Sequence, residues 1–294
     1  MVKKINLIFS FIIISLCIFT FSCSRNDLFG LFSSLDLDER LKERDSFVLI
    51  DENNNWKTSL TLGTSYSFLL ITDTHLEDGK TFGLEDKLAN KIKEFNDDTD
   101  NIPIEFVVFT GDITQKGAEK EILNFIDIAE SLGVPVYPVL GNHDFYFDNW
   151  KYWRDNIGST MYRIDAGTAT LIILDSGNAF YGKEQLDWLE RELKGPKDKT
   201  VFVFTHSNLF ADGIYNMQQT TSAYERARVV NLLKNKCDIM FMGHTHIGQY
   251  NKVGGTEYVV LEGYIEQKGG NNAGAYYIVT VNGSDITRKK HYLK

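Results

Sequence analysis

The sequence predicts an α/β fold in which a second β-sheet packs against the first, and three patterns lead to this prediction. From Tyr66 onwards, short apolar runs alternate with amphipathic, helix-like stretches, which is typical of sheets built from strand–helix–strand units. Towards the end of the chain this alternation gives way to strand-like segments separated by glycine and asparagine residues. Polar clusters recur where the apolar runs end, so the functional site is expected at the carboxyl ends of the strands, where α/β sheets bind ligands.

The predicted elements follow one another regularly along the chain. Strands are expected from the apolar runs at residues 67–72, 105–110, 134–140, 169–174, 201–205 and 239–242. Helices are expected between most of them, at residues 85–95, 118–132, 183–193 and 222–233. In the tail, residues 258–261 and 275–281 are expected to form antiparallel strands joined by turns, with residues 269–272 between them.

Residues 1–22 have the order of regions found in an export signal. Lys3 and Lys4 precede an almost wholly apolar run at 5–21, and the small residue Ser22 follows it. The sequence Thr20-Phe21-Ser22-Cys23 resembles a relaxed bacterial lipobox, which implies that Cys23 is the first, lipid-bearing residue of the mature chain. An uncleaved membrane anchor and cleavage without lipidation are the alternatives. The protein is therefore expected to be exported and held on a membrane through lipid on Cys23, in the periplasm or at the cell surface.

Residues 23–65 form a polar tether and edge segment, with a helix-like stretch at 36–44 and no evident chemistry. Residues 66–294 then form one globular domain, since hydrophobic residues make up 43% and charged residues 24% of the chain without a low-complexity linker. After removal of residues 1–22, Cys237 is the only cysteine besides Cys23, so no internal disulfide framework is expected. Cys237 begins an apolar strand and is interpreted as a small buried hydrophobe.

The net charge disfavours nucleic acid as a partner. It is −9 for the whole chain, and loss of the two lysines within residues 1–22 leaves −11. Such a surface repels a polyanionic backbone, and no basic tract offsets it. A small phosphate ester is still an acceptable substrate, because bound metal ions reverse the local field of a site.

Five of the predicted strands end in polar residues that suit a metal centre. These residues are Asp73 and His75 after the first run, Asp112 after the second, Asn142, His143 and Asp144 after the third, His206 after the fifth, and His244 and His246 after the sixth. Each of the pairs Asp73/His75 and His244/His246 is expected to point the same way in locally extended chain. Neutral imidazole together with carboxylate suits Zn, Fe or Mn, and the absence of thiolate argues against a structural zinc site. Glycines at 111, 141 and 243 precede three of the clusters, where a sharp turn or a close backbone approach needs a missing Cβ.

Taken in order, the series Asp73-X-His75, Gly111-Asp112, Gly141-Asn142-His143-Asp144, His206, Gly243-His244-X-His246 resembles the calcineurin-like metallophosphoesterase superfamily over about residues 66–250. The resemblance implies a four-layer αββα sandwich with two mixed β-sheets and a site for two divalent transition metal ions. It implies that one metal is held by Asp73, His75, Asp112 and His246, and the other by Asp112, Asn142, His206 and His244, so that Asp112 bridges them. His143 contacts the phosphoryl group or the leaving oxygen in this family and is not a ligand.

The chemistry expected of such a site is hydrolysis of a phosphate ester. A hydroxide bridging two metals attacks phosphorus, and His143 assists departure of the leaving group. The catalytic residues are therefore expected to be Asp112 and His143. The alternative of a different class is a lipid-anchored, metal-containing binding protein without turnover.

Departures from the motifs narrow the expected substrate. The second motif continues from Asp112 as Ile113-Thr114-Gln115-Lys116-Gly117, so it lacks the Arg of Ser/Thr protein phosphatases and has Gln115 where purple acid phosphatases have Tyr. The spacing, Leu174-Asp175-Ser176 and the helix start at 182–189 look more like bacterial class III cyclic nucleotide phosphodiesterases, although the second His and the Pro that are common around the position of His206 in that group are missing. A phosphodiester is therefore expected in preference to a phosphomonoester. Aromatic residues at 145–153 either form a substrate wall or pack the loop against the domain, and Asp175 is interpreted as structural.

Overall fold

The computed structural model describes residues 37–42, 60–81, 83–195, 197–210, 220, 222–264 and 274–293. Several predictions fall outside these ranges: the export signal at 1–22, Cys23, the turn at 269–272 and most of the loop that follows His206. None of the helices that the structure describes is long and apolar enough to cross a membrane.

The described strands form two mixed sheets. The first has the order β11-β10-β1-β2-β3, with bounds Asp285–Leu293, Gly274–Asn282, Ser65–Ile71, Ile104–Phe109 and Val136–Pro138. The second has the order β4-β5-β6-β7-β9-β8, with bounds Tyr162–Ala166, Ala169–Ile173, Thr200–Phe204, Ile239–Met242, Thr256–Val260 and Gln249–Val253. Strands β1, β2 and β3 are parallel to one another, as are β5, β6, β7 and β9.

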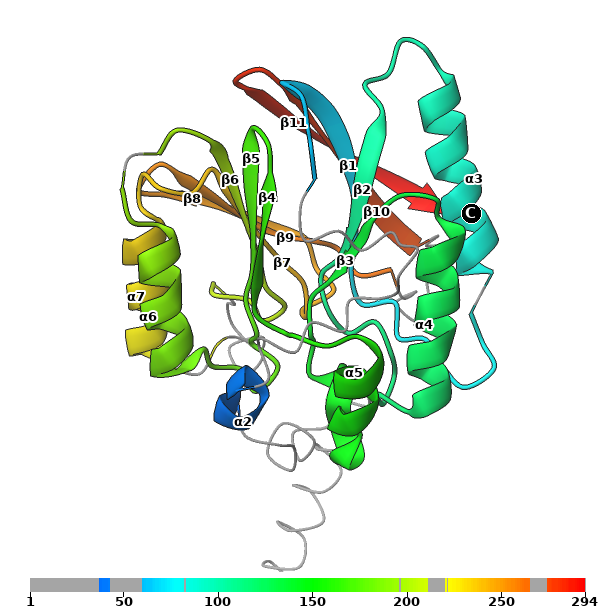
Figure 1. Cartoon of the computed structure of the whole chain (residues 1–294), viewed down its shortest axis with the longest axis horizontal. Helices are drawn as coiled ribbons and strands as arrows, with labels where there is room; N and C mark the ends of the chain where they lie inside the picture. The colour runs from blue at the N-terminus through cyan, green and yellow to red at the C-terminus, as the bar shows by residue number, and fades with distance from the viewer. Residues whose placement is uncertain are drawn as a thin grey trace, which may run out of the picture.

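Helices cover the two outer faces of the sheet pair (Figure 1). Helices α3 (Leu84–Asp97) and α4 (Glu119–Ser131) lie outside the first sheet, and α6 (Gly182–Glu192) and α7 (Ala223–Leu233) lie outside the second. The short helices α2 (Leu37–Lys42) and α5 (Trp150–Asn156) lie at one end of the sandwich. The 3₁₀ segment η1 (His143–Asp148) connects the end of β3 to α5. The expected four-layer αββα sandwich with two mixed sheets is confirmed.

The buried strands of the second sheet are apolar on both faces. Phe202 and Phe204 of β6 point towards the first sheet and pack edge-on against Phe68 of β1, with ring centroids 5.1 and 6.3 Å apart. The intervening Val203 belongs to the core beneath α6 and α7. Successive side chains alternate between faces, so a strand covered on both sides is a continuous apolar run, as found in the sequence. This packing also sets the ends of β1 and β6 opposite each other.

Most predicted elements are present within two residues of their expected bounds, but the tail differs. The strand expected at 258–261 is β9 of the second sheet, and the strand expected at 275–281 is β10 of the first. The expectation that these two pair with each other is therefore wrong. Strand β10 instead pairs antiparallel with β1 and β11, because its apolar residues complete the core of the first sheet.

Candidate metal centre

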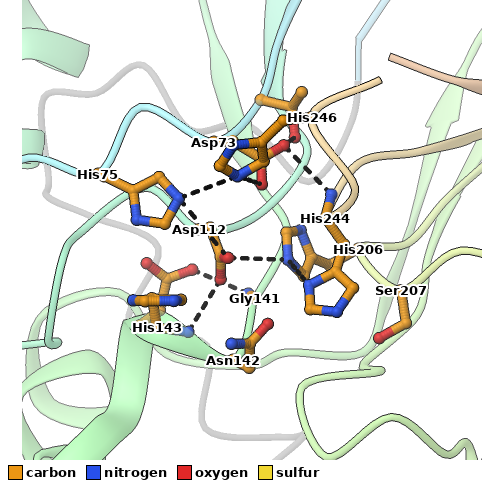
Figure 2. Close-up of polar contacts among 12 residues, drawn as sticks. Asp73, His75, Asp112, Gly141, Asn142, His143, His206, Ser207, His244 and His246 are labelled. Atoms are coloured by element: carbon orange, nitrogen blue, oxygen red, sulfur yellow. Dashed lines mark hydrogen bonds and ion pairs between the residues drawn. The ribbon is translucent and has the colours of Figure 1, made fainter. Parts of the chain in front are cut away.

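Polar residues from five strand ends meet at one edge of the sandwich. Residues that follow β1, β2 and β3 come from the first sheet, and those that follow β6 and β7 come from the second. Figure 2 shows Asp112 at the centre, with His75 and His143 on one side and His206 and His244 on the other. The structure brings together all eight predicted site residues, and all except the half-buried His246 are buried: Asp73, His75, Asp112, Asn142, His143, His206, His244 and His246.

The backbone turns sharply at these strand ends. Positive φ angles occur at Asp73 (54°), His75 (44°), Asp112 (48°), His244 (73°) and His246 (56°). Non-glycine residues rarely adopt this left-handed conformation, which costs on the order of 1–3 kcal/mol each and clusters at functional sites. The expectation of locally extended chain is therefore wrong for both Asp-X-His and His-X-His. Left-handed turns, rather than the two-residue repeat of a strand, bring these side chains together.

Two of the glycines permit the close approach that the cluster needs. A Cβ at Gly111 would lie 2.3 Å from Nδ1 of His206, and a Cβ at Gly141 would lie 2.1 Å from the backbone nitrogen of Asp112. Neither distance leaves room for a methyl group. The prediction that these glycines allow close backbone approach is confirmed.

The distances define three overlapping groups of possible ligand atoms. In each group the atoms lie within 4.8 Å of one another: Asp73/His75/His246, His75/Asp112/His143 and Asp112/His206/His244. Oδ2 of Asp112 is 3.2 Å from Nε2 of His206 and 3.8 Å from Nε2 of His75. Asp112 thus faces histidines of both sheets. The second group also makes His143 a geometrically acceptable ligand, so distance alone does not separate its role from that of its neighbours.

Both buried carboxylates are held in their ionised form. Burial opposes ionisation of Asp73, but the charge and hydrogen bond of His246 outweigh it and lower the pKa of Asp73 to about 2. Burial likewise opposes ionisation of Asp112, and His206 and His143 outweigh it, so the pKa of Asp112 lies well below its usual range. Two negative charges are therefore concentrated where little water reaches them.

The histidines differ in protonation. Burial and His143 lower the pKa of His75 to about 3, and burial and His206 lower that of His244 to about 3. Burial works against a charge on His206 as well, but Asp112 outweighs it and raises the pKa of His206 to about 9. Neutral imidazoles offer lone pairs to a cation, and a proton on His206 is one that metal binding would release.

Two buried oxygen atoms test whether this donor set fits metal ions. Among the described side chains, Oδ1 of Asn142 is buried without a hydrogen-bond partner, and Oδ1 of Asp73 faces Nε2 of His246 at 3.1 Å. A buried polar atom left in this way costs about 1–3 kcal/mol, and a bound cation would satisfy both oxygens. His206 is also oriented for metal binding, because its Nδ1 donates to the carbonyl of Thr110 at 2.9 Å and its Nε2 faces the cluster. The residues therefore fit two oxygen- and nitrogen-bound divalent ions.

Asp144 braces the loops that carry the ligands. Its carboxylate accepts hydrogen bonds from the amides of Thr114 and Gly141, each at 2.8 Å, and from the Thr114 hydroxyl at 3.0 Å. Burial, reinforced by the charge of Asp112, raises the pKa of Asp144 to about 7. Asp144 thus ties the segment after β2 to the segment after β3 without pointing into the cluster.

Several supporting residues have no signal in the sequence. Thr72 donates from its hydroxyl to Oδ2 of Asp73 at 2.7 Å, and the amide of Asn142 donates to the hydroxyl of Tyr146. The hydroxyl of Ser176 accepts the amides of His206 and Ser207 at 3.2 and 2.9 Å. Threonine and serine are common in every loop, so only the structure distinguishes these from their neighbours.

The aromatic loop after His143 mainly packs against the domain. Phe145, Trp150 and Trp153 are buried in its core, whereas Phe147 has 60% of its surface exposed. Packing, and not a substrate wall, is therefore the interpretation that holds for these three buried side chains.

The chain belongs to the calcineurin-like phosphoesterase family, whose model matches residues 66–248. Proteins of this family generally bind two divalent metal ions. In sequence the chain is 31% identical over 155 residues to a probable glycerophosphodiester phosphodiesterase from Arcobacter nitrofigilis, a match that covers 48% of this chain and 56% of that protein. It is 28% identical to a probable cyclic nucleotide phosphodiesterase from Rhodopseudomonas palustris, over 61% of this chain and 71% of that protein. The first of these matches thus spans little more than half of the relative's length.

Solved structures share the fold. A dimetal phosphatase from Danio rerio aligns with a TM-score of 0.61 at 17% identity, over 79% of this chain and 98% of that chain. A purple acid phosphatase from yellow lupin seeds aligns with a TM-score of 0.59 at 15% identity, over 79% of this chain and 52% of that chain. At these identities the likeness is one of architecture.

Proposed function

We propose that this chain hydrolyses a small phosphate ester, a diester in preference to a monoester, with two divalent transition metal ions such as Mn, Fe or Zn. The observation that carries the proposal is the position of Asp112. Its ionised carboxylate lies within 3.8 Å of His75 on one side and within 3.2 Å of His206 on the other. One carboxylate placed between two sets of donors is what two neighbouring cations need.

The donor atoms divide into two sets around Asp112. Asp73, His75 and His246 surround one position, since their ligand atoms lie within 4.8 Å of one another, and His206 and His244 lie with Asp112 around the other. Asn142, whose buried Oδ1 has no hydrogen-bond partner, is the expected further ligand of the second position. Bound ions would provide an activated water as nucleophile and would offset the charge of the phosphate. The described ligands bring only two carboxylates, so a site holding two divalent ions keeps a net positive charge towards an anionic ester.

His143 is the residue suited to the leaving group. Its Nδ1 donates to the carbonyl of Gln115 at 2.8 Å, and its backbone amide donates to Oδ1 of Asp112 at 2.9 Å. These two contacts hold the imidazole beside the cluster, and neither of them uses its Nε2. A proton on Nε2 can be given to the departing alkoxide or hydrogen-bonded to it.

A diester is supported by the relatives, both of which are named as phosphodiesterases. The net charge of −9 makes a long nucleic acid an unfavourable substrate, whereas a small ester carries little charge of its own. The proposal is therefore a small phosphodiester that enters the cationic centre.

Metal removal and restoration tests the proposed hydrolysis. Turnover of a panel of mono- and diesters should fall to background after prolonged chelation and return on addition of Mn, Zn or Fe, while circular dichroism changes little. Asp112→Asn should lose turnover and not regain it with metal. Asp127→Asn, the same chemical change on the exposed side of α4, is the matched control and should behave like the wild type. Full turnover in a metal-free sample would overturn the mechanism, and metal binding without turnover of any ester would favour a binding protein.

We also propose that the chain is exported and held on a membrane by lipid on Cys23. Support comes from the apolar run that ends at Ser22-Cys23. Cys23→Ser should move the protein to the soluble fraction or stall its processing. A fully membrane-bound product of unchanged size would refute lipidation.

A further inference from the structure

Arg40, in the short helix α2, is buried and contacts the loop that follows His143. Its side chain is 0% exposed and forms a two-point ion pair with Asp175, in which Nε and Nη2 donate to Oδ2 and Oδ1, each at 2.9 Å. These two residues are 135 positions apart in the sequence. Helix α2 also lies outside residues 66–248, the part of the chain that matches the family. The pair therefore joins a segment that precedes the family domain to the domain's interior.

Asp175 is a firm point of attachment. It lies two residues after the end of β5, and the side chain of Gln185 in α6 accepts from its amide and donates to its carbonyl, both at 2.7 Å. The next residue, Ser176, holds the amides of His206 and Ser207. The carboxylate of Asp175 is thus fixed relative to the second sheet.

The other face of the Arg40 guanidinium contacts the loop that carries His143. Its Cζ lies 4.4 Å from the centre of the Phe145 ring, a cation–π contact away from water. The Phe145 ring in turn rests on the backbone of Gly177, where an added Cβ would lie 2.6 Å from it. Phe145 is therefore held between Arg40 and the segment after Asp175.

The backbone of this loop provides little regular support. Phe145, Tyr146 and Phe147 have non-helical angles within the 3₁₀ segment, and φ of Phe147 is 55°. The ring of Tyr146 lies 4.5 Å from the ring of His143. Tyr146 is held in part by Asn142, which donates to its hydroxyl, and by Asn149, whose amide donates to its carbonyl at 3.1 Å. The packing of Phe145 adds a further constraint on this irregular segment and, through Tyr146, on the tilt of the His143 ring.

We propose that Arg40 is a positioning residue for His143. Its ion pair with Asp175 holds the guanidinium against the Phe145 ring, and the packed Phe145 helps to orient the His143 imidazole towards the leaving group. This inference rests on the proposed function for its kinetic consequence. It assigns α2 a part in the reaction, whereas the sequence suggests only a tether there. A positional error of about 1 Å in a catalytic group costs up to about 100-fold in rate, so a contact this close matters.

The test uses the full-length chain with Arg40 and Asp175 replaced together, as Arg40→Met/Asp175→Asn, which removes both charges and avoids an unpaired buried one. Its kcat for an alkyl diester such as glycerophosphocholine should fall about 10- to 100-fold. Its kcat for bis(p-nitrophenyl) phosphate, whose leaving group needs little protonation, should change by less than about threefold. Metal content and KM should stay at wild-type values. Phe145→Leu, which keeps an apolar side chain, should show the same pattern and replaces the double variant if that fails to fold.

A spectroscopic readout makes the test independent of turnover. In the zinc-loaded, ¹⁵N-histidine-labelled protein, the Nδ1 proton of His143 is held by the carbonyl of Gln115 and should exchange slowly. In both variants it should exchange faster, while the Nδ1 proton of His206, held by Thr110, serves as an internal reference. His143→Gln assigns the signal.

The matched control is Arg163→Met/Glu192→Gln, which removes a half-buried ion pair between β4 and α6 with a contact of 2.9 Å. It should leave both the leaving-group ratio and the His143 proton unchanged. Folded, metal-loaded variants with a wild-type ratio and a slowly exchanging His143 proton would overturn the role of Arg40. A wild type without turnover on any ester would instead overturn the proposed function, and the proton exchange would still decide whether Arg40 positions His143.

Discussion

Two buried clusters of charged side chains lie at the same end of this sandwich, and they differ in whether their charges have partners. Arg40 and Asp175 satisfy each other through two hydrogen bonds, and the guanidinium also lies against Phe145. The Asp/His cluster, by contrast, leaves Oδ1 of Asn142 and Nδ1 of His75 without hydrogen-bond partners among the described residues. Burial of charge alone therefore does not mark a binding site. A shortage of hydrogen-bond partners around a buried charge does mark a binding site, because a bound ligand supplies the missing partners.

The backbone shows the same contrast. Arg40 lies within a regular helix, whereas five of the residues in the Asp/His cluster have a positive φ. Strained turns persist only where the surrounding structure enforces them. In the metal cluster these turns are held by the close backbone approach at the glycines and by the hydrogen bonds of Thr72 and Asp144.

The largest effect on turnover should come from adding a side-chain atom beside the ligands of the metal cluster. Gly111→Ala adds a Cβ 2.3 Å from Nδ1 of His206 at a φ of 91°, so it displaces His206 and strains the turn before Asp112. Turnover should fall by at least about 100-fold, with loss of bound metal. Gly63→Ala is the matched control, since nothing lies within 4 Å of its Cβ, and it should be neutral. Wild-type metal content and rate in Gly111→Ala would show that the cluster tolerates a different geometry.

A smaller effect, on stability, should come from breaking the satisfied pair. Arg40→Met leaves the Asp175 carboxylate buried and unpaired, which should lower the free energy of unfolding by about 3–5 kcal/mol, measured by denaturant titration. Arg154→Met removes a surface pair with Asp155, whose arginine side chain is 41% exposed, and should cost at most about 1 kcal/mol. If the two variants lost the same free energy of unfolding, the Arg40–Asp175 pair would contribute no more to stability than a surface ion pair does.

The smallest effect is expected from treating the native protein with an alkylating reagent, because Cys237 is buried and belongs to neither cluster. Burial, together with the nearby Asp238, raises the pKa of this thiol, so little thiolate forms even at alkaline pH. Iodoacetamide should leave Cys237 unmodified in the native protein at pH 8 and modify it fully in denaturant, as read by peptide mass mapping. Rapid modification without denaturant would show that this part of the second sheet opens readily.

Much of this fold is predictable because its central strands are buried on both faces. Runs such as residues 201–205 are continuously apolar, and β6 is observed one residue earlier at Thr200–Phe204. Edge strands carry a weaker signal. Strand β11 is exposed along much of its length and contains Arg288, Lys289 and Lys290, so its sequence does not look like a strand. Strand β4 was detectable in principle, since its buried and exposed residues alternate and the two residues Gly167-Thr168 join it to β5.

The candidate site was predictable in its membership but not in its geometry. Polar residues after consecutive strands indicate a shared edge whatever the local backbone does. The left-handed conformation of Asp73 or His244 has no counterpart in the sequence, because neither residue type demands it. The Arg40–Asp175 pair was equally invisible, since it joins residues 135 positions apart and nothing in the sequence links the two.

If Asp112 serves two metal ions while His143 serves none, the metal content per chain will show it most directly. Asp112→Asn and His143→Ala should be purified beside the wild type, and metal and turnover measured on the same samples. Asp112→Asn should lose metal and turnover together. His143→Ala should keep both metals and lose roughly 10²–10⁴-fold in turnover of alkyl esters, with a smaller loss for nitrophenyl esters. A His143→Ala protein that has lost a metal would instead make His143 a ligand, as its place in the His75/Asp112/His143 group would allow.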